Sequence, residues 1–122
     1  HLSLYPTRVL TQLDRDPAPV AVSAAYQKLF NADATCVDDP DRTRYPANNE
    51  VVEQMPSGYR AVSEALRASE DALFTRENPV EGRMRELFPT NGAALGFYAG
   101  GHAMIHLGQL SAWRRAMGLG SA

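Results

Sequence analysis

Two of the chain's three histidines, His102 and His106, lie four residues apart within the stretch GGHAMIHLGQL. Residues at this spacing share one face of a helix, with Cβ atoms about 6 Å apart, so their imidazoles can bind one divalent ion. A structural role is the alternative, with both histidines partly buried and hydrogen-bonded to the backbone or to water. Ala103 stands where the zinc-protease motif H-E-x-x-H has glutamate, so the pair does not indicate a protease.

A catalytic metal needs a third ligand, and His1 is the remaining imidazole of the chain. Three neutral imidazoles leave coordination positions open for water or substrate, and they suit zinc, nickel, iron, cobalt or copper. Two other interpretations of His1 are open. It is either the last residue of a purification tag or a processed N-terminus that chelates copper through its amine and ring.

The element expected to carry the pair is a helix that begins at Thr90 or Asn91, after Pro89, and ends at Met117, with Gly118 as its stop. At about 100° per residue, one stripe of this helix holds six residues: Leu95, Tyr98, His102, His106, Gln109 and Trp113. The glycines at 92, 96, 100 and 108 recur on a neighbouring side, where they would let another helix approach closely.

Two further helical patterns precede this one. Residues 1–14 place Leu2, Tyr5, Val9 and Leu13 on one side, with Pro6 tolerated if the helix starts at His1. Residues 49–74 form an amphipathic pattern whose regular part is expected to begin near Ser57, after Pro56.

The segments between these patterns are rich in turn residues. A long irregular crossing carries Pro17 to Pro46 and holds at most a short helix near SAAYQKLF, and another short helix fits residues 81–88. No run alternates apolar and polar residues at period two, so we expect an all-α fold.

Composition restricts the class of protein. At 122 residues and 44% hydrophobic content, residues 1–122 fit a single domain. The 12 basic and 14 acidic residues form no long run of one sign, so neither a nucleic-acid groove nor a membrane-binding patch is expected. Cys36 is the only cysteine, which excludes an intrachain disulfide and fits a cytoplasmic protein. No membrane span or signal peptide is expected.

The stretch GGHAMIHLGQLSAWRRAMGLG resembles the last helix of DinB-like proteins, the DinB/YfiT superfamily, whose members close with H-x-x-x-H, a Gly-Gln pair and an arginine-rich turn before Leu-Gly. HLSLYPTRVL resembles the family's second helix, and GYRAVSEAL its third. The resemblance implies an up-down-down-up four-helix bundle with His1, His102 and His106 as its metal ligands. It also implies that the family's first helix precedes His1, so that the sequence is N-terminally truncated.

The resemblance further implies a metal-dependent transferase, isomerase or hydrolase that acts on a small molecule, with a low-molecular-weight thiol as a possible partner. In this interpretation Gln109 donates or accepts a hydrogen bond next to the metal ligands, and Tyr5 and Trp113 line the site. The alternative is a non-enzymatic metal-binding or dimerisation module, in which the same histidines fix helix packing. A homodimer is compatible with both.

Overall fold

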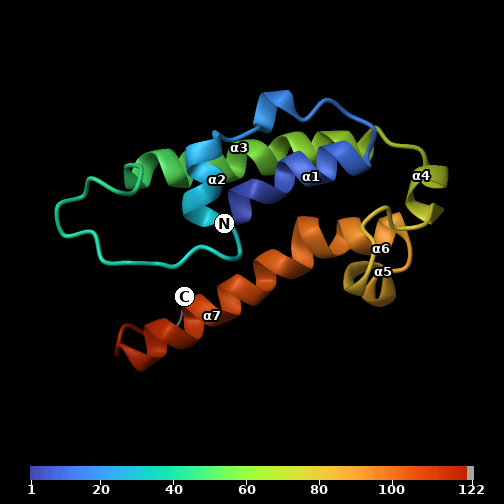
Figure 1. The fold of residues 1–122 in the computed structure, drawn as a ribbon. Coiled ribbons are helices and arrows are strands. Elements are labelled where there is room, and N and C mark those ends of the chain that lie inside the picture. Colours follow the sequence, from blue (N-terminus) through green and yellow to red (C-terminus); the bar gives the residue numbers. More distant parts are fainter. Residues whose placement is uncertain (121–122) are drawn as a thin grey trace. The chain divides into compact units, whose positions relative to one another are not determined.

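The computed structural model describes residues 1–120, and within them it confirms the all-α prediction (Figure 1). This part of the chain has no β-strand, and its one β-bridge joins Glu77 to Thr90. The chain divides into two compact units, His1–Ser69 and Glu70–Ala122. The four-helix bundle and the single domain stay predictions.

The first unit is built on two helices that lie side by side, α1 and α3 (Figure 1). Its elements are a 3₁₀ turn Leu2–Leu4, α1 Tyr5–Gln12, a 3₁₀ turn Ala18–Val20, α2 Ala24–Phe30 and α3 Asn48–Arg67. Pro6 occupies the first turn of α1, where its missing amide breaks no helical hydrogen bond, because α1 starts at Tyr5 after the 3₁₀ turn and not at His1. Val9, Leu10 and Leu13 are buried here, as is Val62 of α3.

The contact between α1 and α3 depends on a glycine. A Cβ atom on Gly58 would lie 2.6 Å from Cγ of Pro6, a distance that real side chains do not tolerate. Only glycine therefore allows the rigid proline ring to pack against the backbone of α3.

The second helical pattern starts within one residue of the observed helix, but the expected late start of its regular part near Ser57 and its expected end at residue 74 were wrong. The helix α3 begins at Asn48 and continues through Pro56, which is exposed, so the carbonyl that loses its amide donor can be hydrated. It ends at Arg67, because Ala68 leaves helical geometry and its carbonyl accepts a hydrogen bond from the Arg15 guanidinium at 3.1 Å.

The crossing segment between α1 and α3 is irregular apart from the 3₁₀ turn Ala18–Val20 and the short α2, which was predicted. Ser23 caps α2 by accepting a hydrogen bond from the Tyr26 amide. Further along, the Asp39 carboxylate accepts three backbone hydrogen bonds, from the amides of residues 43, 44 and 45. Desolvation raises the pKa of Asp39, but these bonds and the Arg44 charge outweigh it and lower that pKa. One carboxylate thus organises the turn.

The second unit contains α4 Asp71–Thr75, α5 Arg83–Leu87, α6 Asn91–Gly96, a π-helical turn Phe97–Gly101 and α7 His102–Ala116. Thr90 caps α6 through the Ala93 amide, and Gly118 ends α7 at φ +73°, so the predicted start and the predicted stop are both confirmed. The predicted last helix is thus helical from Asn91 to Ala116, but the π turn Phe97–Gly101 interrupts its α-helical geometry immediately before His102.

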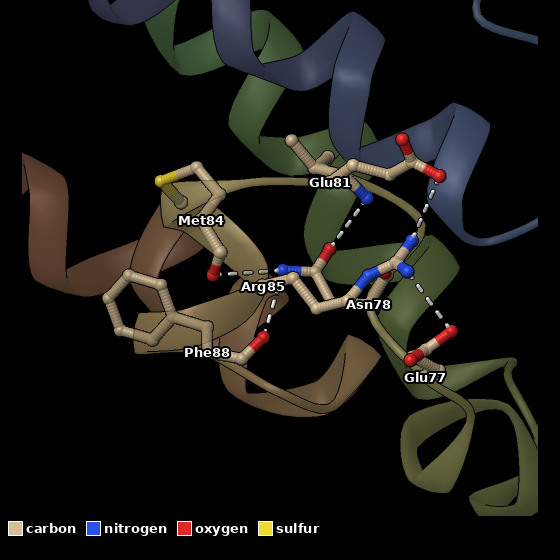
Figure 2. A network of polar contacts seen from close by, with 7 residues as sticks. Glu77, Asn78, Glu81, Met84, Arg85 and Phe88 are labelled. Carbon is tan, nitrogen blue, oxygen red and sulfur yellow. Dashed lines mark hydrogen bonds and ion pairs between the residues drawn. The ribbon is translucent and has the colours of Figure 1, made fainter.

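A buried asparagine organises the loop that carries α5 (Figure 2). The Asn78 amide nitrogen donates to the carbonyls of Met84, at 3.3 Å, and Phe88, at 2.9 Å. Its side-chain oxygen accepts from the Val80 amide. Nε of Arg85 donates to the Asn78 carbonyl at 2.7 Å, and its guanidinium pairs with the two glutamates that Figure 2 labels. The loop is thus held by polar contacts in place of a large apolar core.

The stripe of six residues predicted on the last helix is buried only in its first half. Leu95 and Tyr98 are buried, whereas Trp113 is 53% exposed. The physical reason is that the contacts of α7 are chiefly those with the π turn from which it continues, and such contacts between successive turns of one helix do not cover the Trp113 side chain. Large apolar side chains are consequently exposed along α7 and just beyond it: Met104, Ile105, Leu107, Leu110, Met117 and Leu119.

The glycine side of this helix is used at one position. A Cβ atom on Gly92 would lie 2.9 Å from the carbonyl oxygen of Phe74, so α4 and α6 approach closely there. Gly96, Gly100 and Gly108 have nothing within 4 Å of the corresponding position. That a further helix covers them stays a prediction.

Candidate metal centre

His102 and His106, in the first turns of α7, turn the same ring nitrogen toward each other. Their Nε2 atoms are 3.0 Å apart, and the ring centroids are 4.7 Å apart. Two imidazoles that bind one ion at about 2.0–2.1 Å place their nitrogens about 2.8–3.4 Å apart for coordination angles of about 90–109°. The separation of the pair is therefore compatible with a shared metal, and without one it is that of an N–H···N hydrogen bond.

Gln109 determines which nitrogen of His106 is available. Its side-chain oxygen lies 2.8 Å from Nδ1 of His106, and a carbonyl oxygen can only accept, so Nδ1 carries the proton. The neutral ring then presents the lone pair of Nε2, the atom that faces His102. A hydrogen bond of this kind typically orients a metal-binding histidine and makes it more basic.

His102 is held by aromatic stacking. Its ring is stacked on Phe97, with centroids 5.3 Å apart and planes 6° apart, and Phe97 stacks in turn on Phe88 at 4.8 Å. Burial, followed by the nearby charge of His106, lowers the pKa of His102 below its ordinary value. Both effects favour the neutral imidazole, which is the form that binds a metal.

The π turn explains how this stacking arises. Residues five positions apart in a regular α-helix point about 140° away from each other. In a π turn, residues i and i+5 are brought together, and Phe97 and His102 are separated by this number of residues across Phe97–Gly101. Neither Phe97 nor the π turn was predicted, although the Gly100-Gly101 pair is a local signal for such a turn.

The third candidate, His1, lies in the other unit and is held in a similar way. Its Nδ1 donates to the Phe30 carbonyl, at the end of α2, over 3.0 Å. The Tyr5 hydroxyl lies 3.4 Å from Nε2, and the two rings meet edge to face at 5.3 Å. As in His106, a carbonyl oxygen fixes the proton on Nδ1, and Nε2 is the nitrogen with the lone pair.

The remaining predicted residues differ in their placement. Gln109 contacts His106 and Tyr5 contacts His1. Trp113 lies seven residues after His106, about 10 Å further along the helix, and is exposed, so the structure gives it no role in holding either histidine.

No family model, curated protein or solved structure matches the chain. The resemblance to DinB-like proteins stays a prediction from the sequence. Among residues 1–120, no helix is both long enough and apolar enough to cross a membrane.

Proposed function

We propose that His1, His102 and His106 hold one divalent metal ion in a DinB-like protein. The observation that carries the proposal is the 3.0 Å separation of the Nε2 atoms of His102 and His106, with Gln109 holding the proton on the opposite nitrogen of His106. The three imidazoles form a donor set that could hold a metal. The proposal requires the two units to bring His1 to the pair.

The chemistry proposed for this site is the activation of a small nucleophile. A divalent ion on three imidazoles retains open coordination positions and lowers the pKa of a bound thiol or water, so that a nucleophile is available at neutral pH. Within the chain, Gln109 and the Phe30 carbonyl orient two of the imidazoles, and the Tyr5 hydroxyl is a proton donor next to His1. A metal-dependent transferase, isomerase or hydrolase acting on a small molecule or a low-molecular-weight thiol fits these groups.

The second candidate function is a non-enzymatic metal-binding or dimerisation module. The exposed apolar side chains along α7 favour it, because surfaces of this kind commonly pack against another protein. The coordination number separates the two candidates. A catalytic metal has a coordination position occupied by water, whereas a structural metal has four protein ligands.

Zinc and cobalt titrations of the full chain test the proposal, with elemental analysis for stoichiometry and X-ray absorption to count imidazole ligands. We expect one metal ion per chain with three imidazoles at about 2.0–2.1 Å. His106→Ala should lose the metal and keep its helical circular dichroism, because neither Leu95 nor Tyr98 depends on it.

His1→Gln tests the third ligand separately. If His1 is the third ligand, His1→Gln should bind zinc more weakly than the wild type, and X-ray absorption should detect only two imidazoles on the metal. Wild-type affinity in His1→Gln would reduce the site to a pair, and the absence of metal binding in the wild type would refute the proposal.

A further inference from the structure

A cavity of about 220 Å³ lies beside His1, within the first unit. It is lined by His1, Leu4, Tyr5, Arg8, Asn31 and Ala32. The first four follow the spacing i, i+3, i+4 and i+7, which places them on one face of the N-terminal helical segment. At about 30 Å³ for each water-sized group, the cavity accepts about seven non-hydrogen atoms.

The chemistry of the lining is cationic and donor-rich. Arg8 supplies a guanidinium, Asn31 an amide and Tyr5 a hydroxyl, and none of the six lining residues is acidic. The guanidinium carbon of Arg8 lies 5.8 Å from the centre of the Tyr5 ring, a cation–π contact that restricts where the arginine points. Leu4 adds an apolar wall.

We propose that this cavity is a binding subsite for a small carboxylate, held by Arg8 and Asn31. The planar fork of a guanidinium matches a carboxylate through two parallel hydrogen bonds, and the apolar wall suits a short hydrocarbon body. The cavity shares His1 with the proposed metal centre. Where that centre exists, its substrate is a small carboxylic acid whose far end lies next to a metal ligand. This second statement rests on the proposed function, whereas carboxylate binding itself needs no metal.

Titration of the metal-free full chain with butyrate, followed by amide-resolved NMR, tests the subsite. Butyramide is the neutral control of the same shape. We expect butyrate to shift the amide signals of Arg8, Asn31 and Ala32 and to bind at least about tenfold more tightly than butyramide, because hydrogen bonds to a charged group are stronger.

Arg8→Gln should weaken butyrate binding at least about tenfold while zinc affinity is retained. Arg60→Gln is the matched control, since Arg60 is an arginine of the same unit that lines a different cavity. Asn31→Ala provides a second variant at an exposed position, and it should also weaken butyrate binding.

Equal affinity for butyrate and butyramide, or wild-type butyrate affinity in Arg8→Gln and Asn31→Ala, would overturn the subsite. If the metal proposal fails instead, the protein should not bind zinc but should still bind butyrate. The two proposals are thus tested by separate ligands in the same preparation.

Discussion

Replacing Gln109 by leucine removes the side-chain oxygen that accepts from Nδ1 of His106 over 2.8 Å. The ligand itself remains, so the change isolates the effect of orienting it. Loss of such a hydrogen bond typically weakens metal binding about 10- to 100-fold. Gln109 is exposed, and water can replace part of what it supplies, so we expect the lower end, about tenfold or ~1.4 kcal/mol.

Competition between the protein and a chromophoric chelator for zinc measures this change directly. Gln109→Glu should bind zinc at least as tightly as the wild type, because a carboxylate accepts the same proton and makes the imidazole more basic. Ser111→Ala, two residues further along the same helix, is the control for helix propensity and should have no effect. Wild-type zinc affinity in a folded Gln109→Leu variant would refute the reasoning that Gln109 orients His106.

Three further outcomes are expected. Gly58→Ala should lower the free energy of unfolding by about 1–3 kcal/mol, since its Cβ would meet the Pro6 ring, whereas Gly96→Ala, with open space around it, should raise it by about 0.5–1 kcal/mol in the same denaturant titration. Asn78→Ala should lower the free energy of unfolding by about 2–4 kcal/mol, because the carbonyls of Met84 and Phe88 and the Val80 amide lose their hydrogen-bond partner. A thermal unfolding midpoint equal to that of the wild type would contradict this. Burial and the neighbouring His106 lower the pKa of His102 in the folded chain, so the unfolded chain binds a proton on this imidazole more readily. The free energy of unfolding of the metal-free protein should therefore decrease as the pH falls below about 6.5. Denaturation of His102→Gln between about pH 7 and pH 5 should show a smaller decrease than the wild type.

Local chemistry predicted the helix ends that depend on single residues. Thr90 and Gly118 stop or start a helix through bonds to neighbours a few positions away, so the sequence alone contains the cause. The spacing of His102 and His106 is equally local, and their ring nitrogens do face each other.

The features that the sequence did not reveal depend on contacts between distant residues. The break after Arg67 involves no glycine or proline, and Arg15, which is 53 positions from the Ala68 carbonyl in sequence, helps to hold it. Pro56 predicted a late helix start, but its exposed position makes the proline tolerable. The choice of His1 as a third ligand does not follow from a local pattern, because His1 lies in the first unit and the histidine pair in the second.

The π turn before His102 gives the second unit a means of aiming its two histidines. The turn places one more residue between the buried face of α6 and the histidine pair of α7 than a regular α-helix would need. The histidine pair therefore points in a different direction, relative to that buried face, from the one regular α-helical spacing would give. If the same five residues, Phe97–Gly101, were wound as regular α-helix, both imidazoles would turn by about 100° relative to Leu95 without altering the pair itself. A change between π and α geometry at this turn is therefore sufficient to redirect the histidine pair, whereas deletion of one residue would restore an α-turn and keep its direction, with the caps, the core and the four-residue spacing as they are.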